Sequence, residues 1–433
     1  MTIERQWLEI MKIEVPDAFT PTAPFTPSAG FIDAQIKLMA MPPDGTWATF
    51  LHRQFVQPVT QMFRWGHTRL AFAIACCITM RVPPRRAGAA TVVLAFDDYE
   101  YVPRAKAITQ ARRRARLTPL AFSSSSPLPD RPPTPWPAAM ASRAFKAMVV
   151  ELVILSLPDL IPPASLARDA PTTLIIDWRG ETCDQWTWDA QDPTAPPRRH
   201  TVPRAPLGEA DVKFPHWARR LGVPMVADAI DGDYVPIALR DGGFPPLAIA
   251  RWELGAEVPR TTEWLQIDLL REGLRRAMRM HDFWPTLVVL IGLTGTDYSR
   301  NLPLVKPKKL WMALRSVAPL VPWQYHQEGA APSALDPVRA LDAVVATIYC
   351  RLFTAHTRAV SATLATTLAS MTASRLAPRT KTLLPSLGRA LCTLKNANFL
   401  LQYWGEAEPD SMDPRFGFRV DATGAVDWDE GEG

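Results

Sequence analysis

Residues 90–98 read ATVVLAFDD, an apolar, largely β-branched run that ends in two aspartates. Such a run predicts a buried strand, because β-branched side chains suit a pleated surface. Similar runs occur at 172–177 (TTLIID), 223–228 (VPMVAD) and 247–253 (LAIARWE). Helical patterns lie at 208–221 and 263–280. This alternation predicts an α/β fold with a mostly parallel, twisted sheet flanked by helices.

The flanking regions differ from this alternating part in composition. Residues 1–29 contain four prolines, which predicts a Pro-rich, mostly extended N-terminal arm. The alternating core is predicted at 30–330, with Pro-rich insertions near 117–140 and 181–206, the second a loop or a hairpin. Residues 331–404 predict a helical C-terminal extension, and residues 405–433 an acidic, disordered tail.

The composition excludes several classes of protein. The chain has 433 residues, of which 47% are apolar and 21% charged, so it is not disordered throughout. No apolar run reaches the roughly 18 residues that a membrane span requires. The five cysteines form neither a disulfide framework nor a CxxC zinc spacing. We therefore predict a soluble, intracellular, reduced protein with no membrane partner.

The charge is unevenly distributed along the chain. The formal net charge is +5, although residues 405–433 contain nine acidic residues and only two arginines. The rest of the chain is therefore more basic than the total suggests. The positive charge of residues 1–404 fits a polyanionic partner, most commonly nucleic acid. The alternative is that these basic residues are only the solvated surface of an Arg-rich chain.

Acidic residues next to apolar segments are the main chemical signal. The sequence has no GxxxxGK[ST], no GxGxxG after a strand, no HExxH and no GxSxG. In an open α/β sheet, ligands bind beyond the carboxyl ends of the strands. The carboxylates that follow apolar runs or open the helix at 208–221 are Asp33, Asp97, Glu209, Asp211, Asp231, Asp233 and Asp297.

Several carboxylates in one cleft repel one another unless cations lie among them. Ligands that offer only oxygen suit Mg²⁺ or Mn²⁺. Two such ions ~4 Å apart can activate water and stabilise the leaving oxygen of a phosphodiester. Because any single Asp-x-Asp pair is expected by chance, the signal lies in the repetition of acids after apolar runs.

Five segments resemble, in order, the motifs of the flap endonuclease/XPG family of structure-specific 5′ nucleases, whose fold is PIN-like. They are FIDAQ at 31–35, LAFDDYEYVPRAKAITQARRR at 94–114, GEADVKFPHWARRLG at 208–222, VADAIDGDYVPIAL at 226–239 and LTGTDYSRNLP at 293–303. The resemblance implies that the seven carboxylates hold two Mg²⁺ or Mn²⁺ ions. It also implies that Lys106 and Arg113, seven residues apart on one helix, engage the scissile phosphate.

Other basic residues are candidates for contacts with the nucleic-acid backbone. Arg104, Arg112 and Arg114 compete with Lys106 and Arg113 for the scissile phosphate, or form a solvated basic face. Lys306, Lys308 and Lys309 follow the last motif and could contact phosphates.

The resemblance implies a DNA-repair or DNA-replication nuclease that cleaves branched or flapped DNA by a two-metal-ion mechanism. In a eukaryotic or viral setting it would act in the nucleus or at sites of replication and repair. Two alternatives remain open. One is a catalytically weak, nuclease-like subunit that binds nucleic acid or scaffolds a complex, and the other is an RNA endonuclease on the same core.

Overall fold

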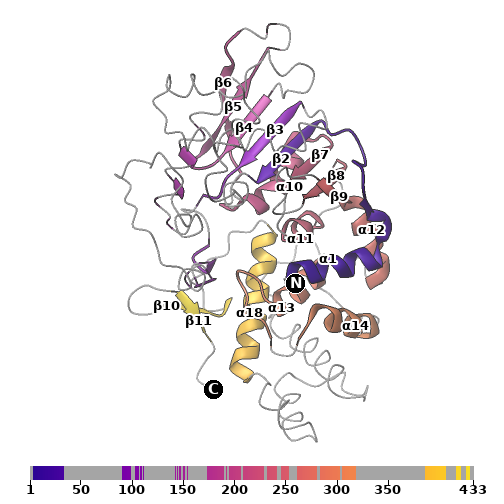
Figure 1. Ribbon diagram of the computed structural model, residues 1–433. Helices are drawn as coiled ribbons and strands as arrows, with labels where there is room; N and C mark the ends of the chain where they lie inside the picture. The colour runs from indigo at the N-terminus through magenta and orange to yellow at the C-terminus, as the bar shows by residue number, and fades with distance from the viewer. Residues whose placement is uncertain are drawn as a thin grey trace, which may run out of the picture.

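A computed structural model gives the fold of the protein (Figure 1). The structure describes residues 3–33, 90–98, 103–106, 108–109, 111, 142, 144, 146–147, 150–151, 154, 173–189, 192, 195–205, 208–228, 232–240, 245–252, 261–279, 283–302, 305–317, 386–405, 416–420 and 426–429. Among the helices of these ranges, none combines the length and the apolar character needed to cross a bilayer.

The centre of the molecule is one large, mixed sheet. Its strands are β1 (Phe19–Thr20), β2 (Ala29–Asp33), β3 (Thr91–Ala95), β4 (Thr173–Asp177), β5 (Thr182–Thr187), β6 (Arg198–Pro203), β7 (Met225–Asp228), β8 (Leu247–Trp252) and β9 (Thr261–Gln266). Their order across the sheet is β1-β9-β8-β7-β2-β3-β4-β5-β6. The expectation of an α/β fold with a mostly parallel sheet is confirmed, because β8, β7, β2, β3 and β4 are parallel neighbours.

The first parallel strand lies in the middle of the parallel part. β2 pairs with β3 on one side and with β7 on the other, so the strand order reverses direction at β2. Both faces of β2 and β3 are buried, as Phe31, Ile32, Val93 and Leu94 show. Strands buried on both faces are typical of parallel sheets, and this point of reversal is where such sheets bind ligands.

Helices cover the sheet and gather at one end of it. They are α1 (Ile3–Glu14), η1 (Pro16–Ala18), α10 (Ala210–Leu221), α11 (Tyr234–Ala238), α12 (Ile267–Met278), α13 (Trp284–Thr294), α14 (Pro307–Val317) and α18 (Leu387–Trp404). Figure 1 shows α1, α12, α13, α14 and α18 grouped below the sheet in that view. Residues from this group and from one sheet face form a single hydrophobic core.

Helix α13 is the centre of this helical group. All of its residues are buried, as expected of a helix that is apolar on every side. It packs against α18, where Gly292 allows a close approach: a Cβ at this position would lie 2.9 Å from the Cβ of Ala397. The predicted helical extension is thus confirmed for residues 387–404, and it is fixed to the core.

The N-terminal region differs from the expected extended arm. Residues 3–14 form helix α1, in which Trp7, Leu8 and Met11 are buried. Their three- and four-residue spacing gives the helix an apolar stripe that packs on α12 and α14. The indole nitrogen of Trp7 also donates a hydrogen bond of 2.9 Å to the hydroxyl of Thr294 in α13. The prolines therefore follow a helix rather than preventing one.

One secondary-structure expectation was wrong in the second half of the core. The segment 263–280 does not form one helix, because residues up to 266 belong to β9 and α12 begins at Ile267. Pairing with β8 holds these residues extended. The apolar run before Asp297, which the sequence left open between a strand and a helix, forms helix α13. A continuous apolar run carries no periodicity that separates a buried strand from a buried helix.

The tail also differs from its expected disorder. Strands β10 (Phe418–Val420) and β11 (Val426–Trp428) form an antiparallel hairpin. Phe418 and Trp428 are buried, and the amide of Asn396 in α18 donates to the carbonyl of Phe416 over 2.8 Å. Apolar residues between the acids thus hold this part of the tail against α18. The second Pro-rich insertion forms the hairpin β5–β6, and the first lies outside the described residues.

Candidate active site

Aspartates mark the carboxyl ends of four neighbouring strands. β2, β4 and β7 end at Asp33, Asp177 and Asp228, and Asp97 follows β3 after one residue. The register places Asp33 beside Ala95 and Ala95 beside Asp177. Because neighbouring strands lie ~4.8 Å apart, these strand ends form one short acidic edge at the point where the strand order reverses.

Helix α10 brings two further carboxylates to this edge. Glu209 is its N-cap residue, and Asp211 lies in its first turn. The amide of Ala210 donates to Oδ1 of Asp97 over 3.1 Å, which joins the helix start directly to the residue after β3. The N-terminus of a helix carries partial positive charge, so it stabilises these carboxylates.

Glu209 is almost completely buried. Only 1% of the residue is exposed, and each of its carboxylate oxygens contacts a different side chain. Lys106 Nζ forms an ion pair with Oε1, and the Tyr298 hydroxyl donates a hydrogen bond to Oε2. These partners lie 103 and 89 residues away in the sequence, so only the fold brings them together.

Asp297 lies in a tight turn after α13. Gly295 adopts φ +98°, a conformation that glycine tolerates, and the amide of Thr296 donates to the carbonyl of Ser299 over 3.1 Å. The hydroxyl of Thr109 donates to the carbonyl of Asp297 over 2.6 Å. The turn is therefore held against the short segment that carries Lys106.

Tyr298 lies within electrostatic range of three of these acids. Burial raises its pKa well above the ordinary value, and Tyr403, Asp211, Asp297 and Asp97 raise it further. Its ring packs against Tyr403 and Phe399 of α18, with ring centroids 5.3 and 5.7 Å apart. We call Asp97, Glu209, Asp211 and Asp297, together with Lys106 and Tyr298, the carboxylate site.

The carboxylate site contains five of the residues that were predicted from sequence: Asp97, Glu209, Asp211, Asp297 and Lys106. Tyr298 was missed, although it stands next to Asp297 in the motif. Asp177 and Lys213 were also missed, although the sequence carried a signal for each. Asp177 ends an apolar run, and Lys213 lies one helical turn after Glu209. Their contacts to the site are described below.

The other predicted residues lie elsewhere or outside the described part. Asp33 ends β2, and its side chain lies outside the described part of the structure. Arg104 is exposed near Lys106, and Lys306, Lys308 and Lys309 are exposed at the start of α14. The residues outside the described ranges are Asp231, Arg112, Arg113 and Arg114.

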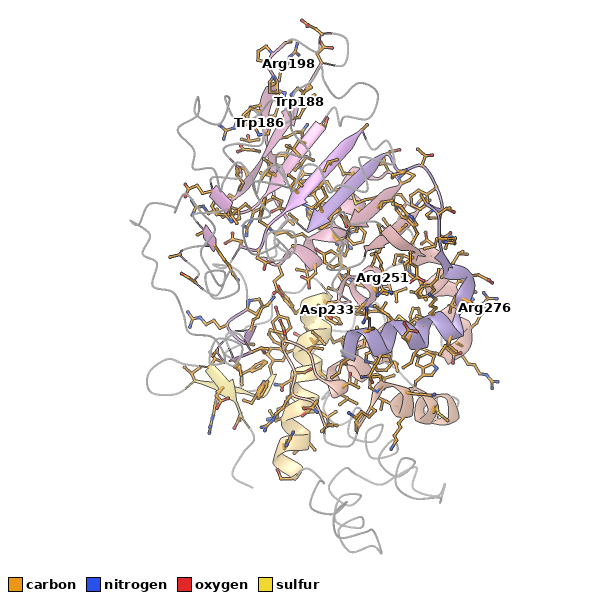
Figure 2. All side chains as sticks on the ribbon, viewed as in Figure 1. Trp186, Trp188, Arg198, Asp233, Arg251 and Arg276 are labelled. Atoms are coloured by element: carbon orange, nitrogen blue, oxygen red, sulfur yellow. The ribbon has the colours of Figure 1, made fainter. Side chains whose placement is uncertain are left out.

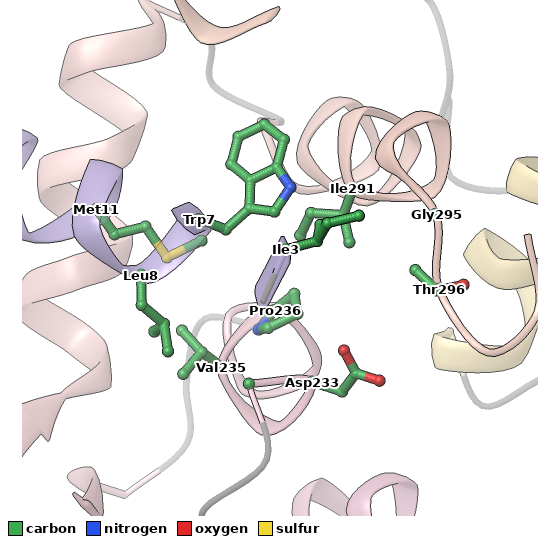
Figure 3. Close-up of a pocket in the computed structure, with 11 residues that line it drawn as sticks. Ile3, Trp7, Leu8, Met11, Asp233, Val235, Pro236, Ile291, Gly295 and Thr296 are labelled. Carbon is green, nitrogen blue, oxygen red and sulfur yellow. The ribbon is translucent and has the colours of Figure 1, made fainter. Parts of the chain in front are cut away.

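Asp233 lies at the rim of a separate pocket between α1, α11 and α13 (Figure 3). Apolar side chains of α1, among them Trp7 and Leu8, form one wall. Asp233 and Thr296 stand on the opposite side. Figure 2 shows Asp233 near the helical group, far from Trp186, Trp188 and Arg198 at the outer end of hairpin β5–β6. Trp186 pairs with Leu174 near the start of β4, whereas Asp177 lies at the other end of that strand.

The donor chemistry of the site suits a hard divalent cation, because its acids offer only carboxylate oxygens. Within the described residues, however, no three or more His, Cys, Asp and Glu side chains are close enough to hold one metal ion. Lys106 provides the positive charge next to Glu209. Among the seven predicted ligands, the side chains of Asp33 and Asp231 lie outside this description.

A scan against protein-family models finds no matching family, and a search of curated proteins finds no match.

Proposed function

We propose that the protein is a divalent-metal-dependent nuclease that hydrolyses phosphodiester bonds in branched or flapped DNA. One observation carries this proposal. Four carboxylates and a lysine, supplied by four separate segments, converge at the edge where the strand order of a parallel sheet reverses. Such an edge is the usual ligand-binding position of an open α/β sheet.

In this proposal the acids would hold two Mg²⁺ or Mn²⁺ ions, and they would have to move closer to one another to do so, because no three of the described acids are close enough to hold one ion in this structure. Asp97, Glu209, Asp211 and Asp297 would be ligands, joined by Asp33 from the end of the neighbouring strand β2. Asp231 lies outside the described ranges, and Asp233 lines the pocket between α1, α11 and α13. When bound, such ions activate a water molecule and stabilise the leaving oxygen of the phosphodiester. Tyr298 orients Glu209 through its hydrogen bond, and the packing of its ring on α18 fixes that orientation.

Lys106 would place positive charge beside the scissile phosphate. In the protein without substrate it pairs with Glu209, and its side chain is 18% exposed, so its ammonium group lies at the border between the acids and solvent. A phosphate bound at the carboxylate site would thus meet Lys106 first. Arg104, Lys306, Lys308 and Lys309 would contact backbone phosphates further away, and Arg112, Arg113 and Arg114 extend the basic segment in sequence.

Cleavage of a 5′-flap DNA tests this proposal. The wild-type protein should cut in Mg²⁺ or Mn²⁺ and stop when EDTA is added. Asp97→Asn/Asp297→Asn should lower the rate by orders of magnitude while the apo protein keeps or gains stability, because two repelling charges are removed. Asp268→Asn, on the exposed face of α12, is the matched control and should cut normally. A fully active double variant would disprove the proposed site.

A nuclease-like binding subunit is the second candidate, and the pairing of Glu209 with Lys106 favours it. This ion pair balances one acid without any metal ion. Such a protein would bind flap DNA in Ca²⁺ and in EDTA with similar affinity, and it would cut in neither Mg²⁺ nor Mn²⁺. Parallel rates on flap DNA and single-stranded RNA then distinguish a DNA nuclease from an RNA endonuclease on the same core.

A further inference from the structure

A fully buried ion pair lies directly behind the carboxylate site. Lys213 in α10 and Asp177 at the end of β4 are both 0% exposed, and the ammonium nitrogen lies 2.8 Å from Oδ1 of Asp177. The other carboxylate oxygen accepts a hydrogen bond of 2.7 Å from the indole of Trp217 and one of 3.3 Å from the amide of Ala205. The carboxylate is thus well satisfied.

Lys213 also holds the backbone next to a predicted metal ligand. Its ammonium group donates to the carbonyl oxygen of Phe96 over 2.8 Å, and Phe96 immediately precedes Asp97. The amide of Phe96 in turn donates to the carbonyl of Asp177 over 2.8 Å. Both polar groups of the Phe96 backbone are therefore tied to the Asp177–Lys213 pair.

The residue on the other side of Asp97 is held as well. The amide of Asp98 donates to the carbonyl of Gly208 over 2.6 Å, and its carboxylate forms an ion pair of 2.6 Å with Arg204. Asp97 thus projects from a short segment that is fixed on both sides. Its own side chain also reaches the start of α10, where it accepts a hydrogen bond from the Ala210 amide.

Lys213 lies four residues after Glu209 on the same helix. Residues at this spacing share one face of a helix, and the amide of Lys213 donates to the carbonyl of Glu209 over 3.3 Å. The ammonium group that holds Phe96 therefore belongs to the helical turn that begins at Glu209. One side chain connects the two backbone segments from which Asp97 and Glu209 project.

The buried ion pair is better suited to fixing the positions of its neighbours than to stabilising the fold. Removing two charges from water is costly, and a well-packed apolar pair of similar volume is often as stable as a buried ion pair. A hydrogen-bonded ion pair nevertheless fixes distances and angles more tightly than apolar contacts do. The buried pair is therefore suited to setting the position of neighbouring groups.

We propose that Lys213, with Asp177, is a positioning residue of the carboxylate site that sets Asp97 at a fixed distance from Glu209. Its link to catalysis rests on the proposed nuclease function. A displacement of about 1 Å in a reacting group can cost about 10²-fold in rate. Loss of the pair should therefore reduce catalysis although neither residue belongs to the carboxylate site.

The test uses Lys213→Met/Asp177→Asn, because the single change Lys213→Met would leave a buried carboxylate without its counter-charge. We expect the double variant to keep its fold and its affinity for flap DNA in Ca²⁺. Its kcat should fall about 10- to 100-fold, and Mn²⁺, measured by electron paramagnetic resonance, should bind more weakly than to the wild type. Arg251→Met/Glu263→Gln removes an ion pair of β8 and β9 and is the matched control, with wild-type values expected.

Hydrogen exchange gives a readout that does not depend on catalysis. In the double variant, the peptides covering 94–98 and 208–212 should lose protection, while peptides of α18 should not. A wild-type protein that neither cuts DNA nor binds Mn²⁺ would disprove the proposed function, and the exchange result would still decide the positioning role. Unchanged kcat, Mn²⁺ affinity and exchange in a folded double variant would overturn the inference.

If the double variant does not fold, Trp217→Phe takes its place. This change removes the indole hydrogen bond to Asp177 and part of the ring that packs against Arg220 and His216, and it leaves both partners of the ion pair in place. We expect kcat to fall a few-fold in a folded protein with unchanged affinity for flap DNA. Wild-type kcat in this variant would overturn the inference.

Discussion

Glu209 combines deep burial with two polar partners. A buried carboxylate is costly unless its charge is balanced and its oxygens are hydrogen-bonded. Lys106 balances the charge and Tyr298 satisfies the second oxygen. The carboxylate site can thus be stable without a bound cation, while Lys106 stays at its border with solvent.

Replacing Lys106 tests its proposed role at the scissile phosphate. Lys106→Ala should lower the single-turnover rate on flap DNA about 10²–10³-fold, because charge beside the reacting phosphate acts mainly on the transition state. Affinity for the same DNA in Ca²⁺ should change little. Lys12→Ala, which removes an exposed lysine paired with Glu263, is the control. Equal rates for Lys106→Ala and the wild type would show that another basic residue serves the phosphate.

The raised pKa of Tyr298 predicts a stability change at high pH. Burial and the neighbouring carboxylates keep Tyr298 protonated in the folded protein, whereas an unfolded tyrosine releases its proton near pH 10. The stabilisation is therefore complete below about pH 10 and is lost as the pH rises further. Tm measured between pH 8 and pH 11 should fall more steeply for the wild type than for Tyr298→Phe. Parallel curves would contradict the burial of this hydroxyl.

Among the elements, hairpin β10–β11 connects the tail to the core. Trp428 is 7% exposed, and its ring lies 5.5 Å from the guanidinium of Arg300, just after the turn that carries Asp297. Helix α18 therefore supports this region from two sides, through the Tyr298 ring and through the C-terminal hairpin.

Removing the Trp428 side chain measures the contribution of this hairpin. Trp428→Ala should lower the free energy of unfolding by about 3 kcal/mol, which is typical of a large buried aromatic residue. Val420→Ala, at a position that is 41% exposed, should change it by less than about 0.5 kcal/mol. Urea titrations followed by circular dichroism provide both values. If Trp428→Ala costs no more than Val420→Ala, the hairpin does not pack on the core in solution.

For the whole molecule, the proposed nucleic-acid partner predicts a strong dependence on salt. The formal net charge of +5 includes nine acids in residues 405–433, so the rest of the chain is more basic. Each DNA phosphate that the protein neutralises should contribute about −0.9 to the slope of log affinity against log salt concentration. Fluorescence anisotropy with labelled flap DNA between 50 and 300 mM KCl measures this slope. A slope near zero would contradict a nucleic-acid partner.

Local sequence patterns were enough to predict much of the parallel part of the sheet and of the carboxylate site. Runs such as 90–98 predicted strands because β-branched side chains favour them locally, and the runs at 90–98, 172–177 and 223–228 each carried a terminal aspartate. Parallel pairing then made the edge with Asp97, Glu209 and Asp211 a reasonable expectation. These predictions required only neighbouring residues and a general rule about parallel sheets.

Long-range contacts determined the remaining features. The apolar run before Asp297 became helix α13 because α18 packs on it at Gly292, and residues 261–266 became β9 because β8 pairs with them. Tyr298 and Lys213 acquired their roles from partners about 90 and 117 residues away. Residues so far apart in the sequence leave no signal in each other's local pattern, since their contact energies arise only when folding brings them together.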